Sequence, residues 1–228
     1  MQATKSGKLV HVALELEALY QEETVRLLNS LDAEVHIIEG ETVREAQHFL
    51  TALTDQSVPV SPAVRTTLGD TGWERRTLGN TYERGRRFEG LLGFLLSQVA
   101  DFKVKERNLR GETDELDIVV QIDNYSRRCW QKSGAPFVLV EAKNWTKPVD
   151  QKEVSAFMTK LQTKRGTARF GCLVGASGFT SAAQTQILKF ATQEHIMVLL
   201  EPEELQKWIA SETSDDFLED LVRRAMLT

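Results

Sequence analysis

The feature that most constrains this sequence is an alternation of short apolar segments with helical patterns between residues 81 and 210. Five segments have the length and apolar content of strands, and they lie at 102–111, 115–123, 136–144, 169–176 and 195–201. Helical periodicity marks 81–100, with Thr81 placed as its N-cap, and three later segments at 149–162, 181–192 and 202–210. This order predicts an α/β protein with a mixed central sheet flanked by helices.

The first 80 residues have a different character. Apolar residues recur at helical spacing over 8–31 and roughly over 41–53, so two helices are predicted there. The segment 56–81 contains two prolines and three glycines with weak periodicity, which is typical of a linker. We therefore expect an N-terminal helical, acidic region with its linker at 1–80, followed by a second domain at 81–228.

The composition excludes several classes of protein. With 228 residues, 41% of them hydrophobic, the chain is long enough for one large domain with a sizeable core. Two cysteines without metal-ligand spacing argue against zinc and against a disulfide framework. No apolar run approaches the roughly 20 residues that cross a membrane, and Glu15 and Glu17 interrupt the N-terminal apolar stretch. A cytoplasmic protein is predicted.

Two carboxylates and one lysine stand where an exposed polar face is not expected. Asp117 lies inside the apolar segment ELDIVV, and Glu141 ends the apolar segment PFVLVEAK, two residues before Lys143. Residues i and i+2 of a strand point to the same side, so Glu141 and Lys143 must share one face of the sheet. If the two strands are neighbours in a hairpin, the Asp117 carboxylate meets the other two side chains at the strand ends.

An acidic pair beside one ammonium suits a hard divalent cation such as Mg²⁺. A cation held by Asp117 and Glu141 can polarise a phosphoryl oxygen and activate a water, and Lys143 can neutralise the charge that develops. Glu89, on the preceding helix, is a third carboxylate that would face the same site. The chemistry that needs this arrangement is hydrolysis of a phosphodiester. For Glu141 and Lys143 alone a structural ion pair is the alternative, and for Glu89 it is a surface pair with Arg86.

These residues resemble a known family. Glu89 in YERGRRFEGLLGFLL, Asp117 in GETDELDIVV and the Glu141-Ala142-Lys143 triplet in FVLVEAKNW match the helix acid, D and ExK elements of the PD-(D/E)xK nuclease superfamily in order and context. The segment RFGCLVGASGFTSAAQTQI, followed by HIMVLLEPEEL, is similar to the Mrr-like branch of restriction endonucleases. The resemblance covers roughly 80–210, and it departs from the family pattern in that no proline precedes Asp117.

The resemblance implies a restriction-endonuclease-like core with an N-terminal helical extension, and a hydrolase that cuts DNA. It implies Asp117, Glu141, Lys143 and Glu89 as catalytic residues. The metal, Mg²⁺ or Mn²⁺ in its place, would be bound by Asp117, Glu141, Glu89 and the carbonyl of Ala142. It further implies a role in defence against foreign DNA, an antiviral function included, or in repair.

The formal net charge of −5, taken as a total, argues against a nucleic-acid partner. The charge is, however, unevenly distributed along the chain. Lys and Arg outnumber Asp and Glu by nine to five over 73–110 and by seven to two over 143–169, whereas both ends are acidic. The basic segments flank the predicted site and can neutralise phosphates. The expected nucleic-acid contacts are Arg84, Arg86, Arg87, Lys105, Gln151 and Lys152.

Other functions stay open at this point. A catalytically silent DNA- or partner-binding subunit with the same fold would bind without cleaving, and a junction-resolving nuclease would prefer branched DNA. One site cuts one strand, so double-strand cleavage calls for two copies, and we expect a homodimer. The acidic N-terminal helices are a candidate surface for a protein partner.

Overall fold

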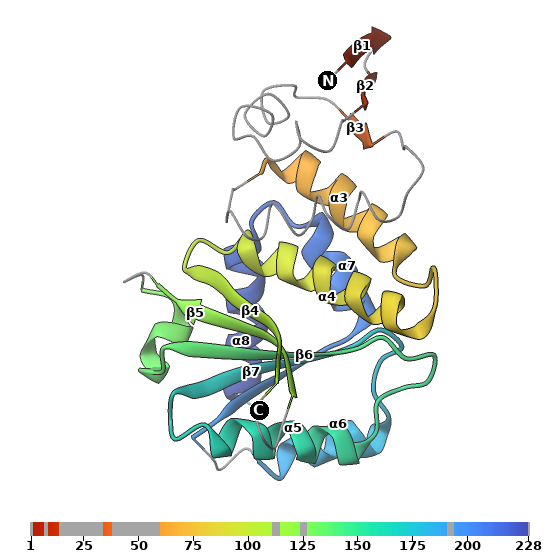
Figure 1. Cartoon of the computed structure of the whole chain (residues 1–228). Helices are drawn as coiled ribbons and strands as arrows, with labels where there is room; N and C mark the ends of the chain where they lie inside the picture. The colour runs from red at the N-terminus through yellow and green to blue at the C-terminus, as the bar shows by residue number, and fades with distance from the viewer. Residues whose placement is uncertain are drawn as a thin grey trace. The chain divides into compact units, whose positions relative to one another are not determined.

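The computed structural model describes residues 2–6, 9–13, 34–37, 60–110, 115–123, 127–190 and 194–227. Its main sheet has five strands in the order β4-β5-β6-β7-β8 (Figure 1). The neighbours β4, β5 and β6 run antiparallel, and β6, β7 and β8 run parallel, so the sheet is mixed as predicted. The strands are β4 Phe102–Arg110, β5 Glu115–Ile122, β6 Phe137–Lys143, β7 Ala168–Gly175 and β8 Ile196–Leu200.

The helices begin at side chains suited to capping. Asn80 forms a reciprocal capping box with Glu83, Asp150 accepts from the backbone N–H groups of Lys152 and Glu153, and Thr180 accepts from Ala183. Within the described ranges, no helix is long and apolar enough to cross a membrane. The helices are α3 Pro62–Arg75, α4 Thr81–Ser97, α5 Gln151–Thr163, α6 Ser181–Leu188, α7 Pro202–Ala210 and α8 Ser214–Leu227, with a 3₁₀ turn, η2, at Cys129–Ser133.

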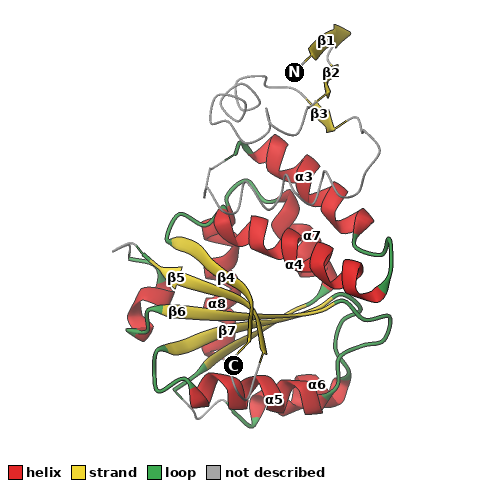
Figure 2. Ribbon diagram, in the orientation of Figure 1, coloured by secondary structure: helices red, strands yellow, loops and turns green. Residues whose placement is uncertain are grey.

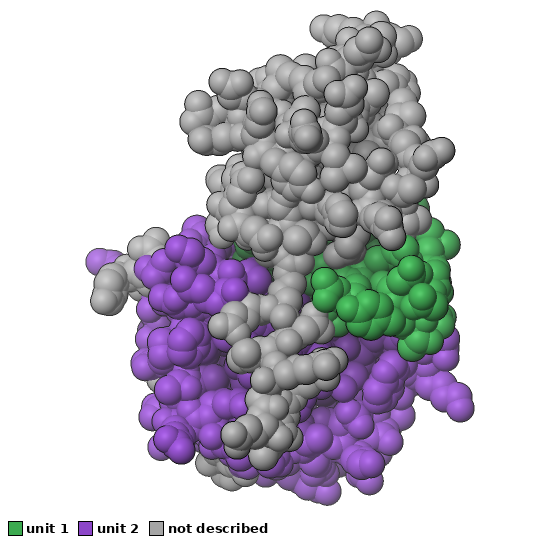
Figure 3. Space-filling model, in the orientation of Figure 1, with its two compact units in different colours: residues 1–98, 209–213 green, residues 99–208, 214–228 purple. Residues whose placement is uncertain are grey.

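The chain divides into two compact units (Figure 3). Unit 1 comprises residues 1–98 and 209–213, and unit 2 comprises 99–208 and 214–228. Within unit 2, α5 and α6 cover one face of the five-stranded sheet and α8 lies on the opposite face (Figures 1 and 2). Unit 2 is thus an α/β layer structure, and it contains both predicted active-site strands.

An apolar cluster joins α5 and α6 to the sheet. Val154, Phe157 and Leu161 of α5 are buried, and they pack with buried residues of β5, β6 and β7. Gly171 of β7 faces this helix so closely that a Cβ there would lie 2.8 Å from the Phe157 ring. The contact fixes α5 against the face of β6 that carries Leu139 and, two residues on, Glu141.

The predicted helix over 8–31 is wrong where the structure describes it. Leu9–Ala13 forms the strand β2, which pairs antiparallel with β1, Gln2–Ser6, and parallel with β3, Glu34–Ile37. Alternating β-branched residues favour a strand, and pairing on both sides stabilises one. The rest of that predicted helix, and the one over 41–53, lie outside the described residues.

The predicted linker is also wrong over much of its length, because Pro62–Arg75 forms α3. Ser61 accepts from the backbone N–H of Val64, and proline is well suited to the first helical position. Gly69, which favoured a linker in the sequence, meets Ile209 instead: a Cβ at Gly69 would lie 2.6 Å from that side chain. The glycine therefore permits a close approach within unit 1.

The remaining differences concern the ends of two helices and one additional helix. The N-cap of α4 is Asn80 rather than the predicted Thr81, because its side chain accepts from the backbone N–H of Glu83. Helix α6 ends at Leu188, before the predicted Thr192. Helix α8 was not predicted.

Candidate active site

The two strands that carry the predicted acids are neighbours. In the antiparallel pairing of β5 with β6, Ile118 lies opposite Val140, and the next step of this register sets Asp117 opposite Glu141. The Asp117 Oδ2 atom accepts a hydrogen bond of 2.7 Å from the backbone N–H of Ala142. The predicted hairpin is therefore confirmed, and it brings the Asp117 carboxylate to the end of the strand that carries Glu141.

Glu141 is a buried carboxylate between two ammonium groups. The residue is 6% exposed. Its Oε1 atom accepts from Lys143 Nζ at 2.8 Å, and its Oε2 atom accepts from Lys160 Nζ at 2.7 Å. A buried charge is tolerated only when it is paired, so both lysines stabilise the ionised carboxylate. The predicted sharing of one sheet face by Glu141 and Lys143 is confirmed by their contact.

The Lys143 Nζ atom also lies 3.2 Å from the Oε2 atom of Glu153 on α5. Burial lowers the pKa of the Lys143 ammonium, but the Glu141 and Glu153 carboxylates outweigh this effect and raise the pKa above its ordinary 10.5. Lys143 is therefore a cation at neutral pH. It can donate hydrogen bonds and neutralise negative charge, and it is not a base.

Two members of this cluster were missed in the sequence, and both come from α5. Glu153 and Lys160 are seven residues apart, so they lie on one side of the helix, along the edge of the stripe that buries Phe157. That spacing was visible in the sequence. Only the packing of α5 on the sheet, however, turns these two side chains toward Glu141 and Lys143.

The cluster provides oxygen ligands for a hard cation. Asp117 and Glu141 come from adjacent strand ends, and the half-buried Ala142, which follows Glu141 in the chain, adds a backbone carbonyl. Among the described residues, no group of three or more His, Cys, Asp and Glu side chains has the geometry to hold a metal. Mg²⁺ commonly uses only one or two carboxylates and completes its shell with waters and phosphate oxygens. This pair fits that requirement.

Glu89 belongs to α4 and thus to unit 1, whereas Asp117, Glu141 and Lys143 belong to unit 2. Its side chain is half-buried and turns back along the helix, with Oε1 3.8 Å from where a Cβ on Gly85 would lie. Its role at the site stays a prediction.

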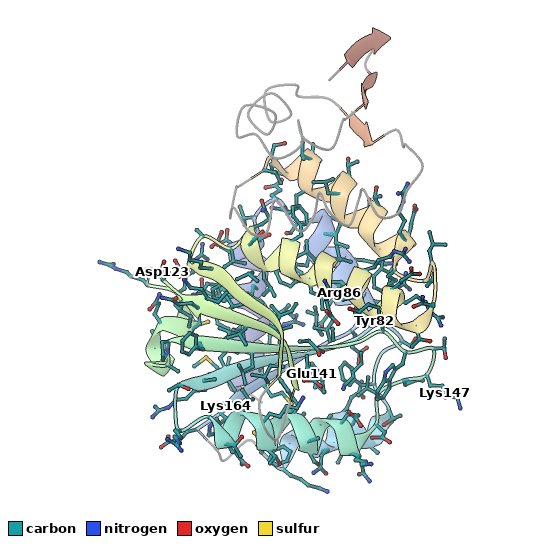
Figure 4. The ribbon with its side chains drawn as sticks, in the orientation of Figure 1. Tyr82, Arg86, Asp123, Glu141, Lys147 and Lys164 are labelled. Atoms are coloured by element: carbon teal, nitrogen blue, oxygen red, sulfur yellow. The ribbon has the colours of Figure 1, made fainter. Side chains whose placement is uncertain are left out.

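The predicted DNA contacts on α4 are arginines of its first two turns. Arg84 donates to the hydroxyl of Thr81, the guanidinium of the exposed Arg86 lies over the Tyr82 ring, and Arg87 donates to the carbonyl of Leu78 (Figure 4). These contacts hold the side chains near the helix start. Their role toward DNA stays a prediction.

The other predicted contacts belong to unit 2 and are exposed. Lys105 occupies a register shift of β4, where the pairing moves from Val104 to Glu106 and leaves one extra residue. Gln151 and Lys152 are the first two residues of α5, on the helix whose later turns carry Glu153 and Lys160. Their contact with phosphate stays a prediction.

The fold is that of an α/β protein with two acids at adjoining strand ends. In agreement, a family model described as restriction endonuclease matches residues 83–209. The chain belongs to this family, and it is a nuclease of the restriction-endonuclease type with that fold. Comparisons with curated proteins and with solved structures give no match.

Proposed function

We propose that this protein is a divalent-metal-dependent endonuclease that hydrolyses DNA phosphodiester bonds through Asp117, Glu141 and Lys143. The observation that carries the proposal is the meeting of both acids and the lysine at adjoining strand ends, with Asp117 bonded to the backbone between the other two. A purely structural ion pair would not need the second carboxylate. The family match supports the same chemistry.

Asp117, Glu141 and the Ala142 carbonyl would hold Mg²⁺, or Mn²⁺ in its place. When bound, this ion supplies Lewis-acid polarisation of the phosphoryl oxygen and a water of lowered pKa. Lys143, held as a cation by two carboxylates, would donate to a non-bridging phosphate oxygen and stabilise the charge that grows there. When Lys143 donates to the phosphate, Lys160 would remain bonded to Glu141 and neutralise its charge.

The test is cleavage of supercoiled plasmid in Mg²⁺ or Mn²⁺ by the full chain and by Asp117→Ala and Lys143→Ala. Matched controls are Asp123→Ala, just beyond the end of β5 opposite to Asp117, and Lys164→Ala, the C-cap of α5 one turn after Lys160; Figure 4 labels both residues. We expect both site variants to lose cleavage and both controls to keep it. Cleavage that survives both site substitutions would overturn the assignment.

The same assay separates the other functions. Binding of DNA without cleavage in any metal would indicate a catalytically silent subunit, and faster cleavage of four-way junctions than of duplex would indicate a junction-resolving nuclease. A role in defence against foreign DNA or in repair is our proposal for the biological setting, and it rests on the family match.

We also propose that double-strand cleavage is made by a homodimer, because one site hydrolyses one strand. Light scattering on the purified protein, alone and with DNA, tests this. A monomer that nevertheless makes double-strand breaks in a single binding event would contradict it. The N-terminal region expected to dock a protein partner is not wholly helical, because Leu9–Ala13 forms β2, and most of the rest lies outside the described residues.

A further inference from the structure

The loop from β6 to α5 carries an exposed tryptophan beside the proposed site. Trp145 follows Lys143 by two residues and is 45% exposed, in the polar segment Asn144–Pro148. By contrast, Trp130 and Trp208 are at most 2% exposed. A single exposed apolar side chain is ordinary, so what distinguishes Trp145 is its place beside the charged cluster of the proposed site.

The loop is fixed at both ends. Near its start, Ser177 Oγ donates to the Trp145 carbonyl at 2.6 Å, and the N–H of Ala176 donates to the Lys143 carbonyl at 3.0 Å. At its end, the N–H of Val149 donates to the Gly178 carbonyl at 2.9 Å. Both anchors come from the turn after β7. Trp145 is therefore presented on a backbone that is held before any ligand arrives.

The indole is electrostatically coupled to the site. Lys143 Nζ lies over the Trp145 ring, 5.2 Å from its centroid, in a cation–π contact. The lysine that would meet the scissile phosphate therefore touches the tryptophan. A group lying against the exposed indole would sit within about one nucleotide of that phosphate.

We propose that Trp145 is a stacking platform for a nucleobase that has left the helical stack beside the scissile phosphate. The substrate class is then DNA with an unpaired or extruded base at the cut position. In intact duplex both faces of each base are covered by its neighbours, so an indole can stack only on a base that is unpaired or flipped out. This inference rests on the proposed nuclease site, since it assigns that site its substrate.

Lys147, on the same loop, is exposed and would contact a backbone phosphate next to the extruded base. The competing explanation gives Trp145 only a positioning role, in which the ring holds Lys143. That explanation predicts equal losses on every substrate when the ring is removed. A stacking platform predicts a loss confined to substrates with an unpaired base.

The experiment measures equilibrium binding in EDTA, where no cleavage occurs, by fluorescence anisotropy of end-labelled DNA. Two probes are compared: a perfect duplex, and the same duplex with one extra unpaired base. We expect the wild-type chain to prefer the bulged probe by about tenfold. Trp145→Leu should abolish this preference without changing duplex binding, and Trp145→Tyr, which keeps an aromatic ring, should retain most of it.

Intrinsic fluorescence provides a second readout, because Trp130 and Trp208 are buried and the half-buried Trp73 contributes equally in the wild type and in Trp145→Leu. The bulged probe should quench the wild-type emission more than that of Trp145→Leu. Equal binding of both probes by the wild type, or an undiminished preference in Trp145→Leu, would overturn the platform. Circular dichroism of each variant checks its fold.

Failure of this inference is distinguishable from failure of the nuclease assignment. Plasmid cleavage in Mg²⁺ without a bulge preference leaves the nuclease site standing and removes the platform. A bulge preference that depends on Trp145, in a chain that cleaves nothing, would remove the nuclease assignment and leave Trp145 as a base-stacking residue.

Discussion

Two buried glutamates in unit 2 offer a direct comparison, Glu141 at the sheet end and Glu219 on α8. They are 6% and 8% exposed, and each accepts hydrogen bonds from two cationic side chains. By burial and pairing alone the two carboxylates are alike. Only Glu141 belongs to the proposed active site, and Glu219 forms a structural ion pair.

The difference lies in the partners. Glu219 is held by the guanidinium groups of Arg128 and Arg223 and by the backbone N–H of Cys129, which joins η2 to α8. Burial raises the pKa of the Glu219 carboxyl, but these three donors outweigh it and lower the pKa below its ordinary 4.5. Arginine forks and a backbone donor fix a carboxylate in place.

Glu141 has lysines instead, and a second carboxylate, that of Asp117, at the adjoining strand end. An ammonium is a point charge on a flexible stem and can move to another acceptor. Burial of an ion pair alone therefore does not mark a site. The proposed site differs in having a second acid beside the ion pair and lysine partners that can move to another acceptor.

The largest expected effect is on cleavage. Glu141→Gln should lower the rate of plasmid cleavage about a hundred- to a thousandfold, because it removes a proposed metal ligand and the carboxylate that orients Lys143. Glu219→Gln is the matched control, and it should leave the rate per folded molecule unchanged. Equal losses in the two variants would erase the distinction between the two glutamates.

For stability we expect the opposite order, with the larger loss in Glu219→Gln and the smaller in Glu141→Gln. Glu219→Gln should lower the free energy of unfolding by about 2 kcal/mol, since two arginines lose their shared carboxylate. Glu141→Gln should cost less, because it also relieves repulsion from the nearby Asp117. Urea denaturation of both variants measures this, and a larger cost at Glu141 would contradict it.

The pH dependence of stability should identify Glu219 specifically. Its folded-state pKa is lower than its unfolded value, so its stabilisation is fully present above about pH 4.5 and is lost as the pH falls through the lower folded value. Thermal melts from neutral to acid pH should therefore fall less steeply for Glu219→Gln than for the wild type. Parallel curves for the two proteins would show that Glu219 carries no such linkage.

The smallest effect concerns metal affinity. Lys160→Gln removes an ammonium 2.7 Å from Glu141 that a cation must compete with, so Mg²⁺ should bind roughly threefold more tightly. Isothermal titration calorimetry without DNA measures this, with Lys164→Gln as the control at the end of the same helix. Weaker binding in Lys160→Gln would mean that this lysine supports the ion rather than competing with it.

Much of the fold was predictable because its local signals are strong. Strands β4 to β8 and helices α4 to α7 follow from apolar periodicity, which short-range backbone geometry enforces. Helix α3 was missed because Gly69 and Pro62 are typical of a linker when seen alone. The glycine is accommodated only by Ile209, 140 positions away in the chain, and no local pattern contains that contact.

The sequence by itself determined the order of Asp117, Glu141 and Lys143 and, through the two-residue period of a strand, the shared face of the last two. Tertiary structure alone decided that Asp117 bonds the backbone N–H of Ala142 and that Glu153 and Lys160 join the cluster. The physical reason is that these contacts depend on strand register and on the packing of α5 against the sheet. Both arise from long-range burial of apolar surface rather than from local preference.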